Sequence, residues 1–291
     1  MKPFLINNQH WHVLNTMVRS PERMDTKGTH FARRLSKVFQ TKNSGRETCL
    51  ILPVKKQVKS WRKANRKMGW GIKEKEFTNV HEPPEITESD RKKGYIGTAL
   101  FYGFGDDGLG NSDSVLSGKA AWEYAGKNRR SGTWKCEYID FDRSDYIRLR
   151  PGAPARPKGF YFAKFRPGDS FLSFTVSRFR KNLVNETGCG PEGIQLITVT
   201  HRHFQKLMKE RKMPFMALAD YDVAPYGHND FFDAAQIFYS NNVIGLGIGN
   251  VDQNYPLFGI PTLSFTSLKG EGFQPSPKET LKTSSVFAPC N

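Results

Sequence analysis

Two aspartates one residue apart, Asp220 and Asp222, end an apolar run in the stretch ALADYDVAPYGHND (217–230). If the chain is extended between them, both side chains point to the same side, because side chains alternate along a strand. Two carboxylates a few Å apart repel each other, so one must be protonated or a cation must lie between them. Mg²⁺ suits such a pair, because it prefers oxygen ligands and needs only one or two carboxylates. The pair therefore predicts a magnesium site, with Mg²⁺ as the cofactor.

The local charge around this pair is the reverse of the charge of the whole chain. Residues 213–268 contain no Lys or Arg but five aspartates, at 220, 222, 230, 233 and 252, whereas the chain has a formal net charge of +16. We expect Arg202, His228 and Asp252 to be accessory residues of the site. The alternative is structural: Asp222 would cap a turn, and Asp220 would accept backbone hydrogen bonds.

A second group of residues is strongly basic. The stretch VKKQVKSWRKANRKMGWGIKEK (54–75) carries nine Lys and Arg, with Trp61 and Trp70 interleaved. Cations bind phosphates by releasing counterions, and indole faces can stack on bases. We expect a helix over 57–68 with one basic face that binds nucleic acid, DNA rather than RNA. The predicted contacts are Lys55, Lys56, Lys59, Arg62, Lys63, Arg66 and Lys67. The alternative is a solvated helix face or a flexible arm.

Length and composition limit the class of protein. A chain of 291 residues can bury a real core. No apolar run reaches the roughly 18 residues of a membrane span, and the first residues show no secretory pattern. We expect no membrane partner and a cytoplasmic, nucleoid or nuclear protein that is not secreted. The four cysteines are far apart, which favours free thiols over a zinc site.

Apolar runs and helical periodicities predict the elements that must position these residues. Strands are expected at 95–105, 133–141, 160–165, 193–199, 214–220 and 242–249, and helices at 118–127, 171–188, 201–212 and 229–240. Apolar strands that alternate with amphipathic helices favour a parallel sheet covered on both faces. We therefore predict that 193–249 forms a β-α-β-α-β unit, with the acidic residues at the carboxyl ends of its strands.

The composition also suggests a division of the chain. The polar segment 81–90 and the Pro/Gly/Arg-rich segment 148–159 are candidate connections. We expect a basic nucleic-acid-binding region at 1–80, an α+β region at 81–150 and an α/β domain at 151–291.

The segment 200–227 resembles the Toprim domain of topoisomerase VI A subunits and the related meiotic double-strand-break transesterases. In that family a T-R-x-F-L stretch opens a helix, and the next strand ends in D-x-D-P-Y-G. The matching residues here are Thr200, Arg202, Phe204, Asp220, Asp222, Pro225, Tyr226 and Gly227. The following stretch, NVIGLGIGNVDQNYPLFGIPTLSFTS, is similar to the family's next strand, so the resemblance covers roughly 193–267.

The resemblance implies a Toprim-like, Rossmann-like parallel sheet in the C-terminal half and a basic α+β N-terminal region. It also implies Mg²⁺ on Asp220 and Asp222, and DNA cleavage through a tyrosine. This sequence departs from the family pattern, because Val223 and Ala224 are inserted and no Glu ends the first strand. Tyr95 and Tyr102 are the nearest tyrosines to an Arg-rich segment, but neither has the family's motif, so no catalytic residue is assigned.

Three functional hypotheses follow. The first is a DNA-binding protein with a Mg-dependent Toprim-like site, related to topoisomerase or nuclease transesterases, with a homodimer as a further expectation. The second is a non-catalytic DNA-binding or assembly protein whose acidic site is vestigial. The third is a haloacid-dehalogenase-like phosphohydrolase, because ADYDVA is similar to the D-x-D-x-[TV] motif of that family.

Overall fold

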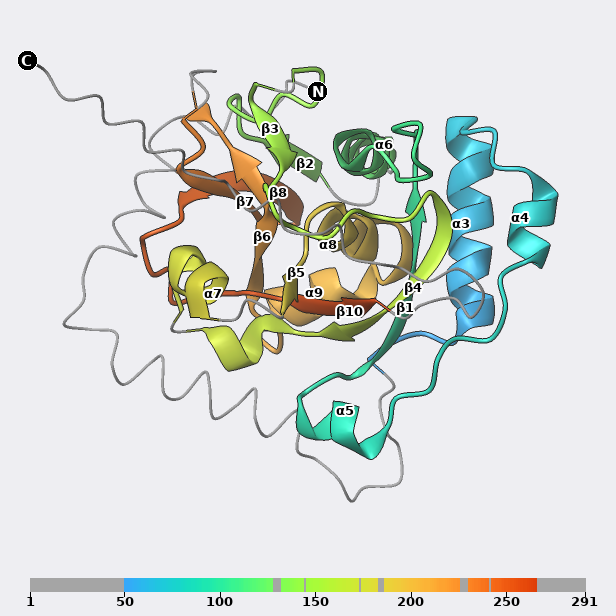
Figure 1. The fold of residues 1–291 in the computed structure, drawn as a ribbon, viewed down its shortest axis with the longest axis horizontal. Helices are drawn as coiled ribbons and strands as arrows, with labels where there is room; N and C mark the ends of the chain where they lie inside the picture. The colour runs from blue at the N-terminus through green and yellow to red at the C-terminus, as the bar shows by residue number, and fades with distance from the viewer. Residues whose placement is uncertain are drawn as a thin grey trace, which may run out of the picture.

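The protein has a mixed α/β fold in which two sheets lie on either side of a buried helical segment (Figure 1). The computed structural model describes residues 50–127, 132–143, 145–172, 174–182, 186–225, 230–240 and 242–265. The central segment is α8 (Pro191–Gln195) followed by one π-helical turn, η3 (Leu196–Thr200). Its α8 part contacts the larger sheet, and η3 contacts the smaller one.

The smaller sheet has four strands, and all of its pairings are antiparallel. The strand order is β1 (Gly97–Gly103), β4 (Gly159–Arg166), β10 (Thr262–Phe265) and β5 (Thr187–Gly188). The longest pairing runs from Gly97 opposite Phe165 to Gly103 opposite Gly159.

The larger sheet is mixed. Its order is β2 (Gly132–Lys135), β8 (Val243–Asn250), β7 (Asp233–Ser240), β6 (Phe215–Val223) and β3 (Ile147–Leu149), with β9 (Phe258–Gly259) also beside β6. The pairings of β2 with β8 and of β9 with β6 are parallel. The other three are antiparallel.

The remaining helices surround the sheets. They are α3 (Val54–Met68), α4 (Glu74–Thr78), α5 (Glu88–Lys92), α6 (Ser114–Gly126), α7 (Val176–Asn182) and α9 (His203–Lys209), with a 3₁₀ turn, η2 (Gly168–Phe171). Figure 1 shows α3 on one side of the molecule, between β1 and the outer helix α4. The α6 helix packs against α8 and η3, so the central segment is covered on several sides.

The strand expected at 193–199 is wrong, because these residues belong to α8 and η3. Every residue from 191 to 200 is buried, so no side of the segment faces solvent and its helical period leaves no polar, exposed stripe in the sequence. A short apolar run of this kind cannot be assigned to strand or helix from periodicity alone, and its β-branched residues favoured the strand.

The helix expected at 229–240 is also wrong, because Asp233–Ser240 form β7. The apolar residues Phe231, Ala234, Ala235 and Phe238 match a helical period, but pairing with β6 on one side and β8 on the other prevails. A signal for this hairpin was present: two asparagines separate Ser240 from Val243, and Asn242 adopts a φ of 62°. Asparagine tolerates that backbone conformation and is favoured in two-residue hairpin turns.

The parallel β-α-β-α-β unit is therefore absent, since β7 lies between β6 and β8 and is antiparallel to both. The carboxyl ends of β6 and β8 nevertheless lie at the same edge of the sheet, as expected. The register places Val223 opposite Asp233, and Asp233 opposite Asn250.

Other expected elements are confirmed, with shifted boundaries: the basic helix as α3, 118–127 as α6, 201–212 as α9, and strands as β1, β2, β4, β6 and β8. The helix expected at 171–188 is confirmed only in part, as α7, and its last two residues instead form β5, which pairs with β10. Pairings also cross the expected division of the chain. The β1 strand, from 81–150, pairs with β4, from 151–291, and β3 pairs with β6.

Candidate nucleic-acid interface and the buried arginine–carboxylate network

The solvent-facing side of α3 is strongly basic. The helix contains no Asp or Glu, and six of its cations are exposed: Lys55, Lys56, Lys59, Lys63, Arg66 and Lys67. Within the described residues none of the six forms an ion pair with a carboxylate, whereas Arg62 lies 2.5 Å from Glu74 and also covers the Phe77 ring. Six of the seven predicted cations therefore present an uncompensated positive face.

The opposite side of α3 is fixed to the edge of β1 by polar side chains. Gln57 Nε2 donates to Leu52 O at 2.7 Å and to Thr98 O at 3.2 Å, and its Oε1 accepts from Leu100 N at 2.7 Å. Trp61 Nε1 donates to Leu100 O at 3.1 Å. These side chains bond backbone groups of β1 that a neighbouring strand would otherwise pair, which holds the helix in a defined orientation.

The two tryptophans do not lie on the basic face. Trp61 is fully buried, and Trp70 is half-buried with its ring centroid 5.9 Å from that of Trp61 and 5.1 Å from that of Phe104. The expected stacking of the Trp61 indole on a base is therefore wrong, because the indole is part of the core.

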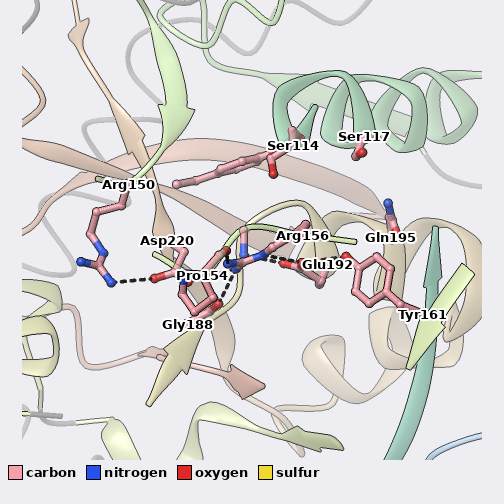
Figure 2. Close-up of polar contacts among 12 residues, drawn as sticks. Ser114, Ser117, Arg150, Pro154, Arg156, Tyr161, Gly188, Glu192, Gln195 and Asp220 are labelled. Atoms are coloured by element: carbon pink, nitrogen blue, oxygen red, sulfur yellow. Dashed lines mark hydrogen bonds and ion pairs between the residues drawn. The ribbon is translucent and has the colours of Figure 1, made fainter. Parts of the chain in front are cut away.

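Asp220 lies at the centre of a buried network of ion pairs (Figure 2). Arg156 Nη2 donates to Asp220 Oδ2 at 3.0 Å, and Arg150 Nη2 donates to Asp220 Oδ1 at 3.3 Å. Arg156 also donates to the backbone carbonyls of Pro154 and Gly188. Both oxygens of Asp220 therefore already have cationic donors.

Glu192 completes the network on the other side of Arg156 (Figure 2). Its Oε1 accepts from Arg156 Nε at 2.8 Å and from the Tyr161 hydroxyl at 2.8 Å, and its Oε2 accepts from Gly190 N at 2.9 Å. Burial alone would lower the pKa of Arg156, but the charges of Glu192 and Asp220 raise it above its usual value. Burial and the Glu192 charge raise the pKa of Tyr161, so its hydroxyl stays protonated.

Asp222 is compensated by two further arginines. Its Oδ1 lies 2.7 Å from Arg180 Nη2, without a well-aligned hydrogen bond, and its Oδ2 lies 4.0 Å from Arg148 Nε. Arg180 is fixed by two hydrogen bonds to Ala219 O. Burial raises the pKa of Asp222, an effect that the Arg180 charge opposes.

These contacts remove the electrostatic reason for placing a cation at the pair. Residues 213–268 contain no Lys or Arg, but the compensating arginines lie earlier in the chain, at 148, 150, 156 and 180. Mg²⁺ needs carboxylate oxygens that are free to coordinate, and Asp220 has none. Among the described residues, no group of three or more His, Cys, Asp or Glu could hold a metal ion.

The sequence contained a signal for two of these arginines. Arg148 and Arg150 have the same one-residue spacing as Asp220 and Asp222. In the antiparallel pairing of β3 with β6, Arg148 lies opposite Asp222, and Arg150 N donates to Asp220 O at 2.8 Å. Residues directly opposite each other share a face, so opposite charges at matching spacing favour this pairing.

The other predicted residues are dispersed. Arg202 precedes α9 and lines a cavity. Asp252 is exposed in the turn after β8, where its backbone N–H donates to Asn250. His228, Tyr226 and Gly227 lie outside the described residues.

The two candidate tyrosines are engaged elsewhere. The Tyr95 hydroxyl donates to Glu186 at 3.5 Å, and the Tyr102 hydroxyl donates to Glu76 at 3.0 Å. Burial, with Glu76 beside it, raises the pKa of Tyr102. A raised pKa leaves less of the hydroxyl ionised at neutral pH, which makes Tyr102 a weaker nucleophile.

Comparisons with known proteins reveal no relative: no family model matches the chain, and no curated protein or solved structure is significantly similar to it. In the part of the chain that the structure describes, no helix is long and apolar enough to cross a membrane. Function must therefore be inferred from the chain's own residues and geometry.

Proposed function

We propose that the protein binds double-stranded DNA through the exposed face of α3, by contacts to phosphates rather than by reading bases. The observation that carries the proposal is the set of six exposed cations without carboxylate partners in the described residues. Duplex DNA carries a condensed layer of counterions, and cations that neutralise its phosphates release them, so the entropy gained by the released ions would drive binding.

The rigid attachment of α3 supports this proposal. Gln57 and Trp61 join the helix to β1 through three hydrogen bonds, and Gln57 also bonds Leu52 O just before the helix. An ordered helix loses less conformational entropy on binding than a flexible basic arm would. The alternative of a flexible arm is therefore not favoured for residues 54–68.

The preference for a duplex comes from the position of the aromatic residues. Proteins that bind single strands without sequence preference stack bases on exposed aromatic rings, but Trp61 is buried beneath the basic face. The major groove of B-form DNA admits an α-helix, whereas that of A-form RNA is deep and narrow. A helix exposed along one side is therefore suited to duplex DNA.

The proposal includes neither strand cleavage nor a metal. The Toprim-like reading needs carboxylates available to Mg²⁺, and the phosphohydrolase reading needs an aspartate that can reach a substrate phosphate. Asp220 is fully buried and bonded to two arginines. Of the three hypotheses, a non-catalytic DNA-binding protein agrees best with these contacts, and the acidic pair then has a structural role.

Binding to three nucleic acids of equal length tests the proposal. Fluorescence anisotropy would compare duplex DNA, duplex RNA and single-stranded DNA over a series of salt concentrations. We expect duplex DNA to bind most tightly, with a slope of log affinity against log salt of up to about −5, if each of the six cations contacts a phosphate. Binding that is absent or independent of salt would contradict the proposal. Tighter binding of the single strand would contradict its preference for a duplex.

A further inference from the structure

A second basic surface lies beside α9, away from the buried network. A cavity of about 540 Å³ is lined by Arg202, Gln205, Lys206, Lys209, Glu210, Tyr239 and Asn242. Three of the lining side chains are cationic and one is acidic.

The acidic member of this lining does not neutralise the cavity. Glu210 lies 3.6 Å from Lys206 and 2.6 Å from Lys212, so it is already paired with two lysines. Lys209 Nζ donates to Asn242 Oδ1 at 3.0 Å. The half-buried Arg202 has no carboxylate partner among the described residues. The cavity therefore has an excess of positive charge, which suits an anionic ligand.

Contacts at the end of α6 connect this cavity to the basic face of α3. Lys67 Nζ donates to Lys127 O at 2.5 Å and lies 5.9 Å from the centroid of the Tyr124 ring. Arg202 is close enough to Tyr124 for its charge to oppose the rise that burial causes in the pKa of that tyrosine. Tyr124 thus lies near one cation of α3, Lys67, and one cation that lines the cavity, Arg202.

A backbone hydrogen bond also joins the start of β2 to Asn242, which lines the cavity. After Lys127 the chain re-enters the described structure at Gly132, whose N–H donates to Asn242 O at 3.1 Å. Asn242 lines the cavity and accepts from Lys209. The end of α6 and the start of β2 thus lie between the two basic surfaces.

We propose that the α9 cavity binds a backbone phosphate of the same DNA that lies along α3, so that the two basic surfaces form one continuous path. This extension depends on the proposed function. The exposed cations of α3, from Lys55 to Lys67, span about 18 Å, or roughly five phosphates along one strand. A DNA molecule must therefore be longer than this to reach Arg202 and Lys209 as well.

Duplexes of two lengths test the path. Hairpin-closed duplexes of about 6 and about 14 base pairs would be titrated against the parent and Arg202→Gln/Lys209→Gln. For the longer duplex, we expect the double variant to reduce the steepness of the salt slope by about 2, because two phosphate contacts are lost. For the shorter duplex its slope should equal that of the parent. The matched control is Arg91→Gln/Lys93→Gln, on and just after α5, which removes the same charge and should leave both slopes unchanged.

The possible failures are distinguishable. If the parent binds neither duplex, the proposed function is wrong, and this extension is wrong with it. If the parent binds both and the cavity variant changes neither slope, or changes both equally, only the continuous path is overturned. Equal melting temperatures of parent and variant confirm that lost binding is not lost folding.

Discussion

The guanidinium of Arg156 lies 3.0 Å from the carboxylate of Asp220, and neither side chain is exposed. The two residues are 64 positions apart in the sequence. Their ion pair attaches the loop before β4 to the middle of the larger sheet. Because Arg156 also pairs with Glu192 at 2.8 Å, one side chain compensates two buried carboxylates.

Arg156→Met should destabilise the protein strongly. The substitution leaves Asp220 and Glu192 buried without their shared partner, and removal of one member of a buried ion pair typically costs about 3–5 kcal/mol. Urea unfolding at neutral pH measures the change. Arg150→Met is the matched control: its side chain is 24% exposed and 3.3 Å from Asp220, so its cost should be clearly smaller. Equal, small effects of the two substitutions would contradict the assigned role of Arg156.

Magnesium should not alter the stability of the parent. Since arginines compensate Asp220 and Asp222, no carboxylate repulsion remains for the metal to relieve. The parent should melt at the same temperature in millimolar Mg²⁺ and in chelator. Asp222→Asn should melt at a lower temperature in both buffers, because Arg180 loses its nearest counter-charge; the expected loss in free energy of unfolding is about 1 kcal/mol or more. A rise in the melting temperature with Mg²⁺ in the parent, but not in the variant, would instead restore the metal site.

His201 should make the free energy of unfolding fall in mild acid. Its Nε2 accepts from Leu52 N at 3.1 Å, just before α3, and its Nδ1 lies 2.8 Å from Thr200 Oγ1. Burial, with His203 beside it, lowers the pKa of His201 from 6.5 to about 3. The pKa of His201 is lower in the folded state than in the unfolded state, so only the unfolded state takes up a proton between these two values. The contribution of the neutral His201 to stability is therefore complete above pH 6.5 and is lost as the pH falls towards 3. The free energy of unfolding should fall by about 1.4 kcal/mol per pH unit in this window.

The test compares parent and His201→Gln, which retains an acceptor for Leu52 N. Urea unfolding between pH 7 and 4 should show a shallower dependence on pH in the variant. Burial also lowers the pKa of His203, so a smaller dependence in the same direction should remain. If the two proteins lose stability in parallel, His201 is not the titrating group.

Secondary structure and surface charge could be predicted from the sequence where a single helix or strand determines them. The α3 helix and its basic face follow from residues 54–68 alone, because helical spacing separates Gln57, Trp61 and Ala64 from the cations. The α6 and α9 helices and most strands were also predicted from local patterns. The same reasoning failed for α8 with η3 and for β7, where burial on all sides or pairing on both sides overrides the local period.

The environment of the acidic pair could be predicted only in part. Asp220 and Asp222 were identified, but their arginine partners were not: the matching spacing of Arg148 and Arg150 was an unused signal, and Arg156 and Arg180 reach the pair through tertiary contacts. No local pattern indicates that a Pro/Gly-rich connection would place Arg156 between Asp220 and Glu192. The absence of nearby cations in the sequence therefore did not mean their absence in space.

The most direct test of DNA binding through α3 compares two variants of equal charge. Lys59→Gln/Lys63→Gln/Arg66→Gln removes three exposed cations from one face of α3, and Arg91→Gln/Lys92→Gln/Lys93→Gln removes three exposed cations from and just after α5. The measurement is the slope of log affinity against log salt for a duplex DNA. We predict that the α3 variant has a slope shallower by about 2–3, since each lost phosphate contact removes about 0.9, while the α5 variant keeps the parental slope. An unchanged slope in the α3 variant, or equal changes in both, would contradict the account.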